Sequence, residues 1–204
     1  AAQVAQILEL SPRNLAASLG ASILVGVLFY RDSGSPWVLV WWLALSLVTA
    51  ARYELVRRFR ALRPKAEDAP VWASWTTAGA LAGGALWGLG IATLAPPWGS
   101  SGYVLAVFMV TGVPAAALWS NSALFSSFAA LLLPILVPYA LQLLFSGHLD
   151  RVLGGLAALI FTGTLAGIGL AASRRAAESF ALRFQNADLI ERLSGANHAL
   201  QEEL

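Results

Sequence analysis

The stretch "GALAGGALWGLGIATLAPP", residues 79–97, mixes glycine with bulky apolar side chains and carries no charge. It lies in a run of 81 residues, from Ala69 to Leu149, that contains no Asp, Glu, Lys or Arg. A helix needs about 20 apolar residues to cross the hydrocarbon core of a bilayer. The run is therefore long enough to cross a membrane several times.

The composition of the 204 residues also indicates a membrane protein. Of these residues, 58% are hydrophobic and 12% are charged, whereas soluble domains carry roughly 25% charged residues. Six spans of suitable length and hydropathy follow one another along the chain. We therefore predict an all-α fold, a polytopic bundle of six transmembrane helices. The predicted spans are residues 13–30, 36–55, 70–95, 103–120, 123–145 and 151–173. The break at Ser120-Asn121-Ser122 is so short that spans four and five must form a tight antiparallel hairpin, and without that break there would be five spans. We interpret Asn121 as a loop residue.

The basic residues predict the orientation, because cytoplasmic loops are enriched in Lys and Arg. With the N-terminus inside the cell, two of the 13 basic residues, Arg31 and Arg151, fall outside. The other eleven fall on the cytoplasmic side: Arg13, Arg52, Arg57, Arg58, Arg60, Arg63, Lys65, Arg174, Arg175, Arg183 and Arg192. We therefore expect a multi-pass protein with both termini in the cytoplasm. No ionisable group is then assigned to membrane depth.

Three segments follow from these patterns. Residues 1–12 are predicted to form an interfacial segment on the inner membrane face, with a frayed tail as the alternative. Ser11-Pro12 is interpreted as the start of the first span. Residues 13–173 form the six-helix membrane domain, and residues 174–204 form a cytoplasmic signalling helix.

Small residues and prolines predict how the helices pack. Four-residue spacing aligns Gly79 with Gly83, Ala80 with Gly84 and Gly88, and Gly163 with Gly167, so that helix backbones can approach closely within the bundle or between two copies. Prolines inside spans four and five delete internal hydrogen bonds and predict kinks with a cavity between these two helices. The kink residues are Pro114, Pro134 and Pro138.

Four residues in the outer half of the predicted spans suit a small apolar or amphiphilic ligand with one polar end. They are Trp41, Trp87, Tyr139 and Gln142. The more common use of such residues is to fill or anchor a bundle, and this alternative stays open.

Several chemistries lack the residues they need. Cysteine is absent, and the two histidines, His148 and His198, have no partner at metal-ligand spacing. The sequence contains neither a phosphate-binding glycine loop nor a nucleophile elbow. We expect no catalytic residue, no metal, no cofactor and no nucleic-acid partner, and hence no enzyme in this chain.

The stretch "LRFQNADLIERL", residues 182–193, changes the pattern to charged residues around a leucine seam. A seven-residue repeat with a polar seam residue is typical of a parallel two-stranded coiled coil. The seam residues are Leu182, Asn186, Leu189, Leu193, Ala196 and Leu200. A single amphipathic helix on the membrane surface is the alternative. No glycine or proline ends this helix at "HALQEEL", and we expect an output domain beyond it.

The sequence resembles the MASE-type six-helix membrane input domains of bacterial sensor histidine kinases and diguanylate cyclases. The resemblance covers nearly the whole chain, and its most distinctive parts are Trp87-Gly88, residues 128–138 and "RFQNADL" at 183–189. It implies a homodimeric protein of the bacterial inner membrane whose last helix leads to a kinase or cyclase domain. Related six-helix kinases detect diffusible lipid-like signals.

We therefore expect a membrane-embedded signal input domain, in a lipid bilayer, that sends a stimulus through its last helix. Two kinds of stimulus stay open, namely a ligand, such as a lipid-like or other small amphiphilic molecule, and the state of the membrane. The first alternative is a small-solute transporter or channel. The second is a structural anchor that dimerises a cytoplasmic enzyme.

Overall fold

The computed structural model describes residues 2–202, and describes side chains from Gln3 to Leu193 except residues 184, 187, 188, 191 and 192. These residues form six long helices and one short 3-10 helix. The long helices are α1 (Ala2–Ser33), α2 (Trp37–Leu62), α3 (Ala69–Leu94), α4 (Ser101–Asn121), α5 (Phe125–Leu144) and α6 (Leu149–Glu202). The short helix η1 (Ala66–Asp68) leads into α3. All six long helices are long and apolar enough to cross a membrane, which confirms the predicted all-α fold and is compatible with a membrane bundle.

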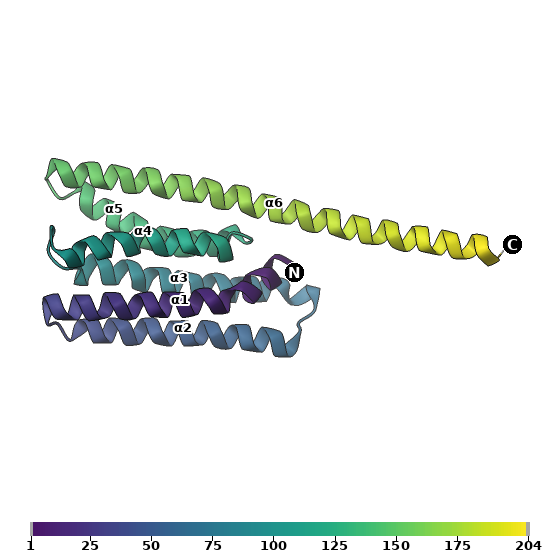
Figure 1. The fold of residues 1–204 in the computed structure, drawn as a ribbon, viewed down its shortest axis with the longest axis horizontal. Coiled ribbons are helices and arrows are strands. Elements are labelled where there is room, and N and C mark those ends of the chain that lie inside the picture. Colours follow the sequence, from purple (N-terminus) through teal and green to yellow (C-terminus); the bar gives the residue numbers. More distant parts are fainter. Residues whose placement is uncertain (1, 203–204) are drawn as a thin grey trace.

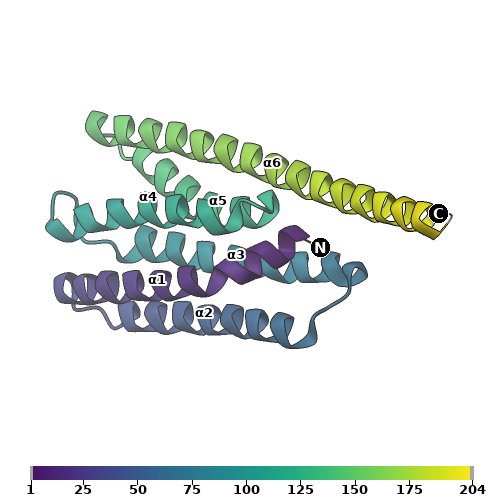
Figure 2. The same ribbon diagram turned by 45° about the vertical axis from the view of Figure 1, so that its right-hand side comes forward.

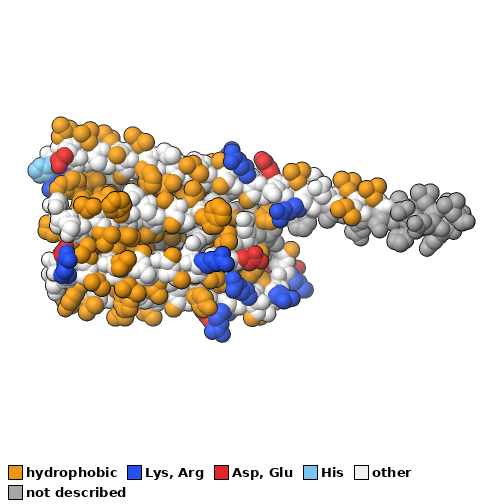
Figure 3. All heavy atoms as spheres, viewed as in Figure 1, with side chains coloured by type: hydrophobic (Ala, Val, Ile, Leu, Met, Phe, Trp, Pro, Cys, Tyr) orange, Lys and Arg blue, Asp and Glu red, His pale blue; other side chains and the backbone are white. Residues whose placement is uncertain are grey.

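The six helices lie roughly parallel in a bundle, and α6 continues far beyond it (Figure 1). The start of α1 and this extension lie at the same end of the bundle (Figures 1 and 2). Lys and Arg side chains gather at that end, whereas hydrophobic side chains cover the length of the bundle (Figure 3). The predicted charge asymmetry is therefore present in three dimensions. The cytoplasmic location of this end stays a prediction.

The uncertain break between spans four and five is a helix boundary. Helix α4 ends at Asn121 and α5 begins at Phe125. The amide of Leu124 donates to the carbonyl of Asn121 at 3.2 Å and closes the turn. The predicted tight hairpin, and with it the count of six, is confirmed.

The interpretation of Ser11-Pro12 as a helix start is wrong, because α1 runs through Pro12. The Ser11 hydroxyl donates to the carbonyl of Ile7 at 2.7 Å, as a residue inside a helix does. The first turns of α1 bend away from the rest of the helix (Figure 1), as expected near an internal proline. Val4 and Leu8 are buried against Val56 of α2, with Phe59 and Trp72 beside them. Residues 2–12 therefore belong to the bundle.

Helices α3 and α5 meet backbone to backbone at two glycines. A Cβ atom on Gly84 would lie 2.6 Å from the carbonyl oxygen of Leu131 and 3.1 Å from that of Ala130. A Cβ on Gly88 would collide with the carbonyl oxygen of Pro134. This confirms the predicted use of the Gly84 and Gly88 stripe for close approach within one bundle.

Two of the three carbonyls that lie at these glycines are set free by prolines of α5. A proline inside a helix frees the carbonyl four residues earlier, so Pro134 frees that of Ala130 and Pro138 frees that of Pro134. Both freed oxygens face glycines of α3, whose Cα–H groups point at them and are weak hydrogen-bond donors. Pro114, Pro134 and Pro138 all lie inside continuous helices. The kinks expected at them stay a prediction.

Replacing Gly88 with alanine should destabilise the bundle by about 1–3 kcal/mol, because the new methyl group meets backbone rather than a mobile side chain. The matched control is Gly163→Ala, where no atom lies within 4 Å of the new Cβ. The control should leave the free energy of unfolding unchanged or raise it by up to about 1 kcal/mol. Unfolding in mixed detergent micelles measures the free energy of unfolding of both variants. Equal values for Gly88→Ala and Gly163→Ala would contradict the packing of α3 on α5.

Candidate functional site

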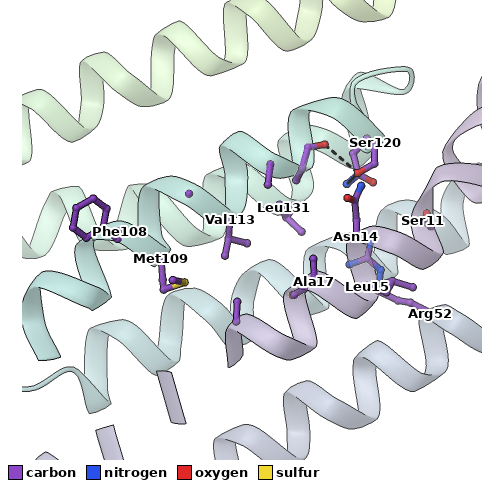
Figure 4. A pocket seen from close by; sticks show the side chains of 16 residues that line it. Ser11, Asn14, Leu15, Ala17, Arg52, Phe108, Met109, Val113, Ser120 and Leu131 are labelled. Atoms are coloured by element: carbon purple, nitrogen blue, oxygen red, sulfur yellow. Dashed lines mark hydrogen bonds between the residues drawn. The ribbon is translucent and has the colours of Figure 1, made fainter. Parts of the chain in front are cut away.

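A large cavity of about 260 Å³ lies among α1, α2, α4 and α5. Polar side chains collect at one end of it, where Ser11, Asn14, Ser120 and Arg52 are found (Figure 4). Phe108 and Met109 of α4 lie at the other end (Figure 4). The cavity therefore has a polar end and an apolar end, an arrangement typical of sites for amphiphilic molecules.

Arg52 of α2 supplies the charge of the polar end. The sequence analysis grouped it with the cytoplasmic basic residues and assigned no ionisable group to membrane depth, but its side chain turns into the bundle. A Cβ on Gly79 would lie 3.0 Å from Cγ of Arg52, and one on Gly83 would lie 3.5 Å from Nη1. The guanidinium therefore lies along a groove of α3 that the two glycines leave open. Charged groups that face the interior of a bundle of spanning helices are often functional.

The polar end also contains a small hydrogen-bond network at the α4–α5 turn. Asn121 is 4% exposed and is therefore not the loop residue that we predicted. Its Nδ2 donates to Oγ of Ser120 at 3.2 Å, and its Oδ1 accepts from Oγ of Ser127 at 3.4 Å. The Nδ2 atom of Asn14 is buried and has no hydrogen-bond partner in the described residues.

The apolar end opens sideways between α1 and α4. Phe108 is 65% exposed, and a Cβ on Gly112 would have no atom within 4 Å. Ala17 on α1 and Ala116 on α4 are also exposed and line the cavity. In a bilayer, this opening would face lipid rather than water.

Two of the four predicted ligand residues lie in the core instead. Trp41 and Trp87 are 6% and 1% exposed and meet edge to face, with ring centroids 5.7 Å apart. Nε1 of Trp41 donates to the carbonyl of Leu86 at 2.7 Å, and Gly90 leaves room for its ring. Nε1 of Trp87 lies 3.4 Å from Oγ of Ser18. Neither tryptophan lines the large cavity.

The other two predicted residues, Tyr139 and Gln142, line a second cavity of about 160 Å³. The hydroxyl groups of Tyr139 and Tyr103 are 3.1 Å apart, and the guanidinium of Arg151 lies 5.0 Å from the ring centroid of Trp98. Trp98, Tyr103 and Arg151 line the same cavity. The four predicted residues therefore do not form one site.

The predicted coiled-coil residues lie on the part of α6 beyond the bundle. Leu182, Leu189 and Leu193 are 59%, 55% and 70% exposed in the single chain, and Asn186 is exposed as well. The side chains of Ala196 and Leu200 lie outside the described residues. Pairing with a second chain stays a prediction.

Comparison with protein-family models, with curated proteins and with solved structures identified no match.

The signal for the large cavity was present in the sequence. Arg52 falls inside the predicted span 36–55, and the glycine pair Gly79 and Gly83 is conspicuous. What the sequence did not reveal is that these residues meet each other, because this depends on the rotation of α2 against α3.

Trp41→Phe should lower the free energy of unfolding by about 1 kcal/mol, because it removes the hydrogen bond to Leu86 while retaining an aromatic ring. Trp37→Phe is the control, since Trp37 is 67% exposed, and it should have little effect. Unfolding in mixed micelles compares the two. Equal effects would indicate that Trp41 does not stabilise the core.

Proposed function

We propose that this chain is a membrane-embedded signal input domain whose last helix transmits a change in the bundle to a cytoplasmic output domain. The observation that carries the proposal is the continuity of α6. This helix packs against α5 within the bundle and runs on without a break to Glu202. The bacterial inner membrane, a cytoplasmic location of both termini and a kinase or cyclase as output belong to the same proposal.

The length of α6 supports transmission over a distance. Its 54 residues span about 80 Å at 1.5 Å per residue, of which the hydrocarbon core takes roughly 30 Å. A rotation or shift imposed on the membrane part of a continuous helix must also move its far end. No described residue from Leu149 to Glu202 interrupts the helix.

Helix α1 supports a link between the cavity and α6. Near the polar end of the cavity, α1 contributes Ser11 and Asn14. At its start, Nε2 of Gln3 donates to the carbonyl of Ser173 in α6 at 3.3 Å. An occupant that moves α1 would therefore act on α6 at the point where α6 leaves the bundle.

The exposed leucines of α6 support pairing of two copies. Three large apolar side chains on a protruding helix, spaced by seven and four residues, gain stability when a second helix covers them. A parallel pair would bring two output domains together and would turn a change within each bundle into a change between subunits.

A small-solute transporter is the second candidate, because a charged group lines a cavity within the bundle. A transporter would move its substrate across proteoliposomes and would still work without residues 176–204. A sensor needs those residues.

Insertions into α6 test transmission. We would join the chain after Leu204, in heptad register, to the dimerisation and catalytic core of a histidine kinase and insert residues after Arg183. One, two or three alanines should lock or reverse autophosphorylation, because each rotates the helix by roughly 100°. Seven alanines restore the register and should restore regulation.

The same insertions placed beside Gly99, in the loop between α3 and α4, are the control and should leave autophosphorylation unchanged. If all insertions after Arg183 gave the same kinase activity, transmission through α6 would be refuted.

Cysteine cross-linking tests the dimer, and the natural sequence contains no cysteine that would interfere. Leu182→Cys places a thiol on the predicted seam, and mild oxidation in membranes should give a disulfide-linked dimer on a denaturing gel. Ala181→Cys is also exposed but lies off the seam, and should cross-link much less. Equal cross-linking at both positions would contradict the coiled coil.

A further inference from the structure

Arg52 lacks the partner that a charge in this position needs. The ion pairs among the described residues join Arg31, Arg57, Arg58 and Lys65 to carboxylates, and none includes Arg52. Within the same part of the chain, its guanidinium makes no hydrogen bond to another group. A charge inside a bundle is costly unless an opposite charge or several hydrogen bonds compensate it.

The neighbouring polar groups leave hydrogen-bond donors unused. The Ser11 hydroxyl is committed to Ile7, and both ends of the Asn121 amide have partners. Arg52 and Asn14 both line this end of the cavity; Arg52 offers its N–H groups, and Nδ2 of Asn14 is buried without a partner among the described residues. Guanidinium and amide N–H groups only donate. The complement to this end of the cavity is therefore an acceptor with negative charge.

The apolar end of the cavity indicates what kind of tail the ligand carries. Val113, Met109 and Phe108 follow one another along α4 away from Arg52, and the opening between α1 and α4 lies beside them. A carboxylate or phosphate without a tail would leave these apolar walls uncovered. A molecule that enters from the bilayer can keep its tail in contact with lipid at Phe108.

We infer that the cavity binds an amphiphile whose anionic head group pairs with Arg52 and Asn14, while an apolar chain of the amphiphile lies along α4. A carboxylate and a phosphate share the required chemistry, because both accept two parallel hydrogen bonds from a guanidinium. The role of this amphiphile as a stimulus rests on the proposed function, but its binding does not.

The binding experiment uses the full chain in nanodiscs of phosphatidylcholine, which has no net charge. The probes are dodecanoate, dodecyl phosphate, 1-dodecanol and inorganic phosphate, in radiolabelled form, at a pH that ionises the carboxylate. Dodecanoate and dodecyl phosphate should bind saturably. Arg52→Met should weaken both by about 10- to 100-fold, the usual range for losing hydrogen bonds to a charged group. 1-Dodecanol should bind more weakly and not distinguish the variant.

Arg57→Gln is the matched control, because Arg57 lies on the same helix with its side chain 70% exposed. It should bind dodecanoate as the natural chain does. Equal affinity of the Arg52→Met variant for dodecanoate would overturn the inference, and so would binding of 1-dodecanol as tight as that of dodecanoate. Inorganic phosphate binding as tightly as dodecyl phosphate would refute the part played by the tail.

A stability measurement shows whether Arg52→Met still folds. Methionine retains the apolar contact over Gly79 while removing an unpaired charge, so the melting temperature of the ligand-free variant should equal or exceed that of the natural chain. A lower melting temperature would indicate that Arg52 is structural, and would overturn the inference. Dodecanoate should raise the melting temperature of the natural chain but not that of the variant.

Two further comparisons identify the source of the ligand and separate the proposals. If phosphatidylglycerol in the nanodisc abolishes dodecanoate binding, the natural occupant is an anionic lipid of the bilayer. If it does not, the occupant is a single-chain amphiphile, and the inference stands in both cases. The two proposals can also be separated. If ligand binding depends on Arg52 but insertions in α6 do not change autophosphorylation, the sensor function is refuted and the binding site stands.

Discussion

The contact between α3 and α5 is the interaction on which the arrangement of this bundle depends. Lipid tails are as apolar as leucine side chains, so helices in a membrane gain little from the hydrophobic effect when they associate. Close packing has to supply the stability. Here Gly84 and Gly88 let α3 approach the backbone of α5, and two of the three carbonyls that meet them, those of Ala130 and Pro134, are ones that the prolines of α5 set free. Glycine and proline are thus matched across one interface.

The position of the other helices follows from this contact. Helix α5 is the most buried of the six spans, because half of its apolar stretch is buried, and α6 packs against α5 as well. A Cβ on Gly155 of α6 would lie 2.9 Å from the carbonyl oxygen of Ala140. Helix α6 therefore meets the rest of the bundle mainly through α5, which leaves its other faces open along its length. This placement at the edge of the bundle is compatible with the proposed transmission, because few neighbours would have to move with α6.

The sequence predicted the elements of this fold better than their contacts. The positions of the spans follow from hydropathy, which is a property of each segment and does not require knowing which helices it packs against. The close approach at Gly84 and Gly88 followed from the spacing of these glycines. Pro12 was misread because the apolar contacts of Val4 and Leu8 with Val56 extend the helix past a residue that often starts one. Trp41 was associated with a ligand because residue type and depth do not reveal that Leu86 offers its indole a carbonyl at 2.7 Å.

Arg52 shows why the cavity needed three-dimensional information. Near the end of a spanning helix, a long cationic side chain can extend toward water or turn inward, and the sequence is the same in both cases. The outcome depends on whether a neighbouring helix leaves room, and here Gly79 and Gly83 leave it. Helix α1 borders this cavity and also contacts Ser173 of α6 through Gln3. Neutralising the charge of Arg52 would therefore act on α1, the helix that connects the cavity with α6. A ligand shifts an equilibrium between two packings only as far as it binds one better than the other. In the proposed sensor, the unpaired guanidinium would supply such a difference if an anion bound more tightly in the packing that brings Asn14 of α1 onto the same head group.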